Sequence, residues 1–460
     1  MLITAAIDAR LAEICRAEHV LQDPSECWVY GYDNSRGHAL PERVIFPERH
    51  EQIVAIMNVC IDHNIPLVVR GRGTGTTGAT IPTAGGIVLS TERMNRIIKV
   101  DPDNRSMIVE PGVTNQQVQD EAAKVGFFWP PDPTSAAFCS VGGNLAYNSA
   151  GPRAVKYGTC RENVLGLRAV TGRGKELRTG VHTTKGVVGY DLTRLLIGSE
   201  GTLAIITEAT LKLTPLPETK RTMRATYTDV RSATAAIVRI MAQPVTPCAL
   251  EFMDSLAINM IRKHTQVELP KDAGALLIIE VDGLHTDIDA IAQLIAIAAQ
   301  NDGLMELKIA DTPTAVKELW DTRKALSPAL RNVAPKKINE DVVVPVSHLP
   351  ELIEGLTELA THHRITIVNF GHAGNGNIHV NLLVNPDDSA EMDRAKKCLA
   401  GTFAVVLRLQ GTLSGEHGIG LEKRDFIAQE LSSEALAVMR EIKQVFDPSN
   451  ILNPGKLLPP

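Results

Sequence analysis

The chain has 460 residues, about three times the usual length of one domain, so we expect two or three domains. Hydrophobic residues make up 44% and charged residues 22% of the chain, a balance typical of folded soluble proteins that excludes disordered and collagen-like classes. The formal net charge of −6, without a dense basic run, excludes nucleic acid as the partner.

No segment of the sequence is suited to a membrane or to export. The longest apolar runs, such as 276–279, are far shorter than the roughly 20 residues that cross a bilayer, so we expect no membrane span. The N-terminus carries Asp8 and Glu13 and shows no export or import signal. The seven cysteines form no Cys-x-x-Cys pair, which argues against a disulfide framework or an iron–sulfur cluster. A cytoplasmic protein is expected, and peripheral attachment at the inner membrane is the alternative.

The sequence pattern changes near residue 217, which predicts a domain boundary there. Before it, short strand-like runs at 67–69, 86–89 and 107–109 alternate with glycine-rich turns. After it, strands and helices alternate in an α+β pattern. The expected helices are 230–242, 286–301, 314–333, 349–360 and 432–446, and the expected strands are 277–281, 342–346, 365–369 and 378–384. We predict an N-terminal helical segment at 1–37, a glycine-rich domain at 38–217 and an α+β domain at 218–457.

A glycine-rich loop at 70–78 is the first motif that indicates a ligand. Gly73, Gly75 and Gly78 follow a strand-like run with the spacing of a dinucleotide-binding fingerprint. Only eight residues separate Gly78 from Ile87, too few for the crossover helix of about 10–12 residues that a Rossmann unit needs. The loop is therefore interpreted as a nest of backbone N–H groups for a diphosphate, with a plain surface turn as the alternative.

Two further clusters of small and polar residues follow the first loop. One covers 130–148 and contains Gly142 and Gly143, and the other covers 198–203. Three such loops within about 200 residues indicate one long ligand that passes several backbones.

These three clusters, in this order, resemble the FAD-binding domain of the vanillyl-alcohol oxidase and p-cresol methylhydroxylase superfamily, and the resemblance covers nearly the whole chain. It implies a two-lobed FAD-binding domain of the p-cresol methylhydroxylase type, in which the first loop binds the pyrophosphate and the later stretches line the ribityl chain, the flavin and the adenosine. The residues that it assigns to FAD are Arg70, Gly71, Arg72, Gly73, Thr74, Gly75, Pro131, Asp132, Ser135, Gly142, Gly143, Asn144, Asn148, Gly198, Glu200, Gly201, Ile206 and Asn453. The first loop has neither histidine nor cysteine, so non-covalent FAD is expected, and a link to Cys139 or Cys160 stays open.

Histidines and a carboxylate form the densest chemical signal of the second half. On one helix His372 and His379 would lie about 10 Å apart, too far to share an ion, so a helical zinc site is excluded. Glycines between them permit a bend, after which a histidine of the bend can meet one of the following strand. Glu416 would complete a set of two histidines and one carboxylate, and His417 would remain available. Two polar turns whose histidines bind backbone carbonyls are the alternative.

These motifs resemble the C-terminal FAD-linked oxidase domain of the D-lactate, D-2-hydroxyglutarate and glycolate dehydrogenases. The resemblance implies an α+β domain with a largely antiparallel sheet, in which His372, His379 and Glu416 hold a divalent metal, usually zinc. It also implies that His417 acts as the base and that Asn381 faces the substrate. Asn375 stands where many members have aspartate, a departure that touches no ligand position.

A charged residue interrupts the apolar stripe of the helix expected at 314–333. Arg323 shares this stripe with Trp320 and Ser327, and an inward arginine needs an acidic partner. From the pattern alone, an internal ion pair and the carboxylate of a substrate are equally suitable. The resemblance favours the substrate, so Arg323, Trp320 and Ser327 are predicted to bind it together with Asn381.

The combined hypothesis is the oxidation of a D-2-hydroxy acid to the 2-oxo acid, with hydride transfer to FAD and proton transfer to His417. Asn339 stands where relatives acting on 2-hydroxyglutarate tend to carry a lysine, so D-lactate is the favoured substrate. D-2-hydroxyglutarate is the next candidate, followed by the role of a glycolate oxidase catalytic subunit.

Two other classes of protein and several partners stay open. A metal-dependent hydrolase and a non-catalytic flavin-binding subunit are the alternatives to the dehydrogenase. The electron acceptor is expected to be a quinone, a cytochrome or an electron-transfer flavoprotein, and a homodimer is one option for the assembly.

Overall fold

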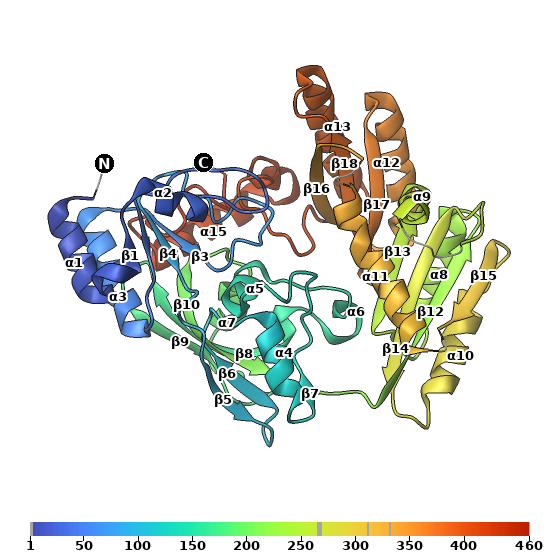
Figure 1. The fold of residues 1–460 in the computed structure, drawn as a ribbon, viewed down its shortest axis with the longest axis horizontal. Helices are drawn as coiled ribbons and strands as arrows, with labels where there is room; N and C mark the ends of the chain where they lie inside the picture. Colours follow the sequence, from blue (N-terminus) through green and yellow to red (C-terminus); the bar gives the residue numbers. More distant parts are fainter. Residues whose placement is uncertain (1–2, 265–268, 311, 331–332, 460) are drawn as a thin grey trace. The chain divides into compact units, whose positions relative to one another are not determined.

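The computed structural model describes residues 3–264, 269–310, 312–330 and 333–459, and the chain divides into two compact units (Figure 1). Unit 1 consists of Met1–Ala150, Gly158–Leu216 and Glu416–Pro460, and unit 2 consists of Gly151–Tyr157 and Pro217–Gly415. The last segment of the chain therefore returns to the unit that contains the N-terminus.

Unit 1 has two lobes, each built on its own sheet. The first sheet has the order β1-β2-β4-β3, with parallel pairing of β4 to both of its neighbours. The second sheet is antiparallel and has the order β5-β6-β10-β8-β9. The strands of both sheets are β1 (Val20–Leu21), β2 (Arg43–Ile45), β3 (Leu67–Arg70), β4 (Ile87–Ser90), β5 (Ile97–Asp101), β6 (Ser106–Val109), β8 (Val164–Thr171), β9 (Glu176–Gly180) and β10 (Ala204–Lys212). A small pair joins β7 (Phe127–Phe128) to β11 (Thr214–Pro215).

Helices of unit 1 bury the apolar sides of these sheets. In the first lobe, Ile53, Ile56 and Met57 of α3 share a core with Leu67 and Leu89. The helices are α1 (Ala5–Cys15), α2 (Pro24–Cys27), α3 (His50–His63), α4 (Asn115–Ala123), α5 (Val141–Tyr147), α7 (Leu192–Leu196), α14 (Ile427–Glu430) and α15 (Ser433–Phe446), and the 3-10 turns are η1 (Ala17–His19), η2 (Trp28–Tyr30), η3 (Cys160–Glu162) and η7 (Arg424–Phe426). In the second lobe, Val118 of α4 and Leu145 of α5 pack with Trp129, Ala169 and Leu211.

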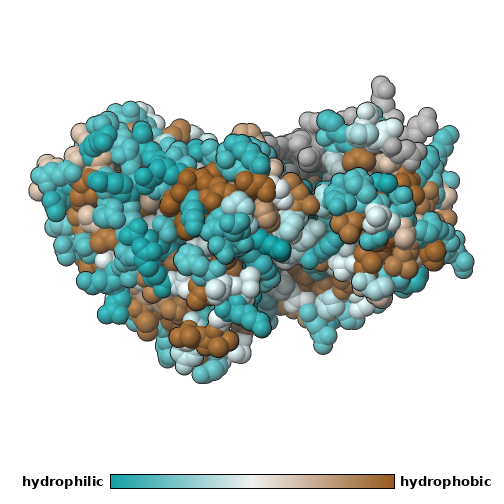
Figure 2. All heavy atoms as spheres, turned by 90° about the horizontal axis from the view of Figure 1, so that it is seen from below, coloured by the Kyte–Doolittle hydropathy of each residue, from teal (hydrophilic) through white to brown (hydrophobic). Residues whose placement is uncertain are grey.

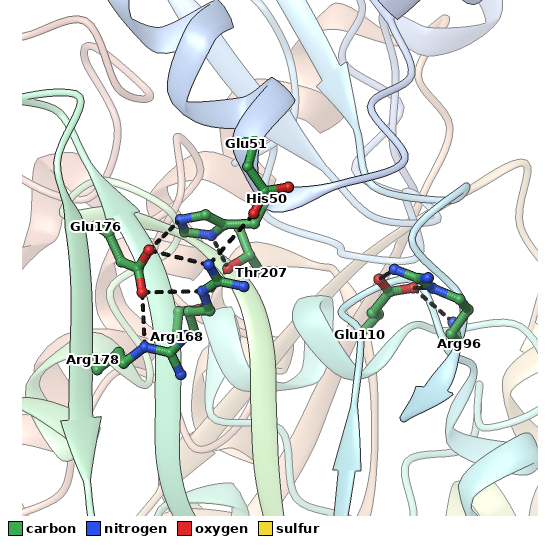
Figure 3. Close-up of polar contacts among 8 residues, drawn as sticks. All are labelled: His50, Glu51, Arg96, Glu110, Arg168, Glu176, Arg178 and Thr207. Carbon is green, nitrogen blue, oxygen red and sulfur yellow. Dashed lines mark hydrogen bonds and ion pairs between the residues drawn. The ribbon is translucent and has the colours of Figure 1, made fainter. Parts of the chain in front are cut away.

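Polar contacts tie α3 of the first lobe to the second sheet (Figure 3). The Nδ1 of His50 lies 2.8 Å from the Thr207 hydroxyl, and its Nε2 lies 3.1 Å from Glu176. Arg168 donates two hydrogen bonds to Glu176, and together with Arg178 it lowers the pKa of that carboxyl to about 2. The two lobes of unit 1 are therefore joined by a polar contact as well as by the chain.

Unit 2 is built on one seven-stranded sheet with the order β15-β12-β14-β13-β17-β18-β16. Every neighbouring pair in it is antiparallel. The strands are β12 (Thr219–Tyr227), β13 (Ala249–Asp254), β14 (Ala275–Gly283), β15 (Leu304–Ile309), β16 (Lys336–Val343), β17 (Thr366–His372) and β18 (Asn377–Val384). The predicted α+β class, with a two-lobed first domain and a largely antiparallel second sheet, is confirmed.

Helices cover both faces of this sheet, and every residue of the central strand β13 is therefore buried. On one face, Leu326 and Leu330 pack on Met253, Ile278 and Phe370. That face is covered by α9 (Ser255–His264) and α11 (Pro313–Ala329), whereas α8 (Val230–Met241), α10 (Ile288–Ala299), α12 (Leu349–His363) and α13 (Ser389–Arg408) pack on the sheet from the other face. Short turns are α6 (Ala154–Tyr157), η5 (Val346–His348) and η6 (Ala373–Asn375).

One predicted strand has the wrong bounds. The sequence predicted a strand at 342–346, but β16 spans Lys336–Val343 and ends before Pro345. Proline has no N–H group to donate to a neighbouring strand, so the ladder stops there. The true strand begins earlier, at Lys336, because residues 336–343 pair in continuous antiparallel register with β18, although most of them are polar.

The surface gives no sign of a membrane-spanning helix. Within the described ranges, no helix is both long enough and apolar enough to cross a bilayer. The face of the molecule in Figure 2 mixes hydrophilic and hydrophobic residues, with the hydrophobic patches interrupted by polar side chains.

Candidate active site

Unit 1 contains a cavity at the place where its glycine-rich loops meet. Seven residues predicted to bind FAD line it: Gly71, Gly142, Gly143, Glu200, Gly201, Ile206 and Asn453. These residues come from the first loop, from α5, from the turn before β10, from β10 itself and from the C-terminal tail. Segments that are far apart in the sequence thus form one cavity wall.

Glycines form part of this wall where no larger residue would fit. A Cβ atom on Gly71 would lie 2.4 Å from the Ser140 hydroxyl, and one on Gly142 would lie 2.6 Å from the Cβ of Pro111. Ser140 also caps α5 by accepting a hydrogen bond from the Gly143 N–H. Glycine lets the backbone lie close to a diphosphate-containing cofactor, so the cavity fits FAD.

Other residues predicted to bind FAD lie outside the cavity lining, and they are Arg70, Arg72, Gly73, Thr74, Gly75, Pro131, Asp132, Ser135, Asn144, Asn148 and Gly198. Several of them have structural partners. The buried Arg70 guanidinium donates to the Tyr32 carbonyl and lies over the ring of Tyr30, so it attaches the loop to the N-terminal segment. The Asn148 side chain accepts a hydrogen bond from the Arg161 N–H.

Glu200 and Asn453 connect the segments of the cavity wall. The buried Glu200 carboxylate accepts hydrogen bonds from the N–H groups of Ile419 and Gly420 at 2.6 and 2.8 Å. Burial nevertheless raises the pKa of Glu200 to about 7. The Asn453 amide donates to the Glu200 carbonyl, and its oxygen accepts from the Val69 N–H of β3 at 3.0 Å.

Some residues of this wall were not singled out from the sequence, among them Tyr147, Ser199 and Thr91. Tyr147 and Ser199 lie within the predicted clusters at 130–148 and 198–203. Tyr147 ends α5 and lies four residues after Gly143, a spacing that puts both on one side of a helix. Thr91 lies outside the predicted clusters and carries no comparable pattern.

In unit 2 a bend brings two histidines together. β17 ends at His372, and the chain turns through η6 and through Gly376, whose φ of 71° favours glycine, before β18 begins. The antiparallel register pairs His372 with Asn377 and Phe370 with His379, so both histidines project from the same face. Their rings lie 5.2 Å apart between centroids.

The third member of the cluster follows directly on the last residue of unit 2. The Gly415 N–H donates to the Asp341 carboxylate at 2.8 Å, and the Ser414 hydroxyl donates to the same carboxylate at 3.1 Å. Asp341 stands opposite His379 in the pairing of β16 with β18, which leaves Glu416 one peptide bond beyond this anchor. One ligand atom each of His372, His379 and Glu416 lies within 4.8 Å of the others.

This donor set fits a divalent metal ion. Two imidazoles and one carboxylate are the ligands that zinc takes in catalytic sites where a further position stays open for substrate. The His372 Nδ1 lies 2.5 Å from the Glu251 carboxylate, an arrangement that leaves the Nε2 for the ion. His372 and His379 are buried and Glu416 is partly exposed.

The residues predicted to bind substrate belong to α11 and to β18. The Arg323 Nε donates to Glu251 at 2.7 Å, so the internal ion pair considered from the sequence exists. The Trp320 indole donates to the buried Glu280 at 2.9 Å. Asn381 is buried on β18, opposite Asn339 of β16, and no described group hydrogen bonds to its side-chain oxygen. The side chain of Ser327 lies outside the described residues.

His417 follows Glu416, and its backbone contacts other residues of unit 1. Its carbonyl accepts a hydrogen bond from the Thr77 hydroxyl at 3.3 Å. The next residue, Gly418, has a φ of 80°, and a Cβ atom there would lie 2.6 Å from both Glu200 and Tyr147. These two residues line the cavity of unit 1, so the chain passes from Glu416 to the cavity wall within two peptide bonds.

Comparisons with known proteins identify both parts of the chain. Residues 41–180 match the family model of an FAD binding domain, and residues 216–457 match that of the C-terminal domain of FAD linked oxidases. The second match begins where the chain enters unit 2 and extends beyond it into the final segment of unit 1.

Relatives of known name resemble the chain over nearly its whole length. The glycolate oxidase subunit GlcD of Bacillus subtilis is 36% identical over 457 residues, which cover 99% of this chain and 97% of that protein. A D-lactate dehydrogenase of Archaeoglobus fulgidus is 36% identical over 415 residues, which cover 90% of this chain and 91% of that protein.

Solved structures share the fold at low sequence identity. p-Cresol methylhydroxylase with substrate bound has a TM-score of 0.79 at 16% identity, and the match covers 98% of this chain and 96% of that chain. The 4-ethylphenol oxidase of Gulosibacter chungangensis has a TM-score of 0.79 at 19% identity and covers 99% and 97% of the two chains. The fold predicted from the resemblance to the vanillyl-alcohol oxidase and p-cresol methylhydroxylase superfamily is therefore confirmed.

Proposed function

Because the chain belongs to the family of FAD-linked oxidases that includes glycolate oxidase subunit GlcD and D-lactate dehydrogenase, we propose that it is a metal-dependent dehydrogenase of D-2-hydroxy acids. D-Lactate is the proposed substrate, and the 2-oxo acid and reduced FAD are the products. The oxidoreductase family leaves no support for the metal-dependent hydrolase. Non-covalent FAD is part of the proposal, since the first loop at 70–78 carries neither histidine nor cysteine.

The observation that carries the proposal is the donor set of His372, His379 and Glu416 beside the Glu251–Arg323 pair. Zinc or a similar cation held by the three ligands would lower the pKa of a substrate hydroxyl, as it does for water. Arg323 uses only its Nε for Glu251, so its terminal N–H groups serve the substrate carboxylate. Asn381 offers its side-chain oxygen from the neighbouring strand.

His417 is the proposed base. A ring nitrogen of its imidazole would accept the hydroxyl proton as a general base. The α-carbon loses its hydrogen with both bonding electrons as hydride, and FAD supplies the two-electron acceptor for it. The proton on His417 then leaves to solvent, so that one hydroxy acid yields one 2-oxo acid.

The proposed preference for a short acid depends on β16. Asn339 stands opposite Asn381 and therefore projects from the face that carries His379. A neutral amide there offers no full charge to a second carboxylate of the substrate, which favours D-lactate over D-2-hydroxyglutarate. Trp320, held by Glu280, would add apolar surface for a short side chain.

Glycolate is the second candidate substrate. The Bacillus subtilis relative, a glycolate oxidase subunit, is as similar to this chain as the Archaeoglobus fulgidus D-lactate dehydrogenase, each at 36% identity. Glycolate shares the carboxylate and the adjacent hydroxyl of lactate and differs by one methyl group, which is worth only about 1–3 kcal/mol in a pocket. If glycolate is the substrate, further subunits are expected to accompany the chain.

One experiment tests the proposal directly. The yellow protein is mixed without oxygen with D-lactate, L-lactate, glycolate and D-2-hydroxyglutarate, and the flavin band at about 450 nm is followed. We expect D-lactate to bleach it fastest and a chelator to stop bleaching with the flavin still bound. Bleaching that ignores the chelator contradicts metal dependence, and no bleaching by any acid contradicts the dehydrogenase. The same reduced protein, offered a quinone, a cytochrome or an electron-transfer flavoprotein, identifies the acceptor.

A further inference from the structure

We propose that Glu251 is a positioning residue that holds the metal ligand His372 and the substrate anchor Arg323 in one fixed arrangement. The inference rests on the proposed function and extends it to a residue that touches neither metal nor substrate. Glu251 came to light only through the structure, because β13 lies more than one hundred residues before the histidines.

The two oxygens of Glu251 have one partner each. Oε1 lies 2.5 Å from the Nδ1 of His372, and Oε2 lies 2.7 Å from the Nε of Arg323. The side chain is fully buried, and its strand pairs Glu251 directly with His372. A carboxylate in this place is thus shared between two groups that the reaction needs.

The contact with His372 selects its tautomer. An ionised carboxylate only accepts hydrogen bonds, so the His372 Nδ1 must carry the proton that is shared with Glu251. The Nε2 then keeps its lone pair, which is what a metal ion requires. Without this partner, the proton is free to move to Nε2 and to block the ligand atom.

The contact with Arg323 fixes the guanidinium plane. Glu251 takes the Nε on one side, and the Phe370 ring lies 4.7 Å from the guanidinium carbon. Phe370 precedes His372 by two residues on β17 and stands opposite His379, so the arginine rests on the strand that carries the first metal ligand. The terminal N–H groups are thereby held at a constant place relative to the metal.

Charge makes the three residues interdependent. The buried Glu251 carboxylate lies between His372 and the Arg323 guanidinium, and the charge of Arg323 balances its own. Removing one partner from a buried ion pair leaves an uncompensated charge, which costs more than the pair gains. A change at Glu251 must therefore affect the metal site and the carboxylate anchor together.

The variant Glu251→Gln tests the inference with little change of shape. Its amide presents one acceptor and one donor, so either His372 or Arg323 faces an N–H group instead of an oxygen. We expect the dissociation constant for Zn²⁺, measured by chelator competition on the flavin-loaded protein, to rise about 10- to 100-fold. The visible spectrum of the Co²⁺-loaded protein should change, the KM for D-lactate should rise, and the flavin content should stay the same.

Glu280→Gln is the matched control. Glu280 is another buried carboxylate on the same sheet, and it also binds a side chain of α11. Its other partners are Lys220, Thr222 and Cys248 rather than a histidine. Its loss should lower the melting temperature comparably and leave the affinity for Zn²⁺ unchanged. If both variants lower the affinity for Zn²⁺ equally, the effect is general destabilisation and the inference is overturned.

The remaining outcomes separate this inference from the function on which it rests. A folded Glu251→Gln protein with the Zn²⁺ affinity and KM of the parent overturns the positioning role while the dehydrogenase stands. A parent protein that binds no Zn²⁺ overturns the metal-dependent function itself. Should Glu251→Gln not fold, Glu251→Asp keeps the charge and shortens the reach, and a smaller loss of Zn²⁺ affinity in the same direction supports the inference.

Discussion

The cavity of unit 1 and the histidine cluster of unit 2 are built by opposite means. In the cavity, Gly71 and Gly142 lie so close to Ser140 and Pro111 that neither position has room for a side chain. In the cluster, side chains such as His379 and Glu251 come from central strands and are fixed by register and by hydrogen bonds. The cavity depends on glycines, which lack a side chain, whereas the cluster depends on the functional groups that its side chains carry.

The difference predicts two kinds of failure. Adding an atom should damage the cavity, because its walls have no room to yield. Removing a functional group should damage the cluster, because each side chain there has a distinct task. Flavin content and metal content therefore serve as separate measurements for the two units.

Loss of a metal ligand should have the largest effect. His379→Ala is expected to abolish Zn²⁺ binding and to reduce turnover of D-lactate about a thousandfold, since a bound cation contributes several kcal/mol to catalysis. Flavin absorbance should be unchanged. Metal analysis and single-turnover flavin reduction measure both effects, with the exposed His362 replaced by alanine as the control. Retained Zn²⁺ in His379→Ala would show that the cluster is not the metal site.

A methyl group in the cavity wall should come next. In Gly71→Ala the new Cβ would displace the Ser140 hydroxyl and weaken the cap of α5, so we expect FAD binding to weaken roughly 10- to 100-fold. Flavin fluorescence during reconstitution measures this, while Zn²⁺ binding should persist. Gly283→Ala is the control, because a Cβ there meets its nearest neighbour at an ordinary 3.5 Å. Equal FAD affinity in both variants would exclude Gly71 from the binding wall.

The sequence predicts the glycine-rich loops of unit 1 but not which group each of their residues contacts. Glycine spacing identifies a chain that approaches something closely, as at Gly71 and Gly142, and it does not say what is approached. Arg70 illustrates this, since its cationic side chain, predicted to bind the phosphate, also donates to the Tyr32 carbonyl. Such a partner comes from a distant segment whose position depends on the packing of the whole lobe.

The histidines of the cluster in unit 2 are easier to predict from the sequence than the carboxylates that hold them in place. His372 and His379 flank a bend of glycines, and alternation along a strand puts His379 and Asn381 on one side. Glu251 and Asp341 hold this arrangement from other strands, and no local pattern marks them. A buried carboxylate is recognised only when strand order and register are known.

Substrate length is the next test, with a moderate expected effect. Asn339→Lys puts a cation on the strand beside Asn381, and a hydrogen bond to a charged group is worth about 1.5–3 kcal/mol. We expect kcat/KM for D-2-hydroxyglutarate to rise roughly 10-fold relative to that for D-lactate. Asn339→Met, of similar length without the charge, should not show this change. An unaltered ratio in Asn339→Lys would mean that β16 does not contact the distal end of the substrate.

The smallest expected effect concerns the ionisation of Glu200, a buried carboxyl group in the cavity wall. Its pKa is raised from 4.5 to about 7 by burial, so the folded state holds the proton more tightly than the unfolded chain does. The stability gained in this way is complete below about pH 4.5 and is lost as the pH rises through about 7, a change of about 3 kcal/mol in the free energy of unfolding.

Glu200→Gln is neutral throughout this range, so its melting temperature should fall less than that of the parent between about pH 5 and about pH 8. Calorimetry on the FAD-free protein measures the two slopes, and Glu434→Gln on the exposed side of α15 serves as the control. Identical slopes in parent and Glu200→Gln would mean that the hydrogen bonds from Ile419 and Gly420 keep the carboxylate ionised in spite of its burial. Parallel titrations with FAD bound would then show whether the cofactor senses this charge, because Glu200 lines the cavity that receives it.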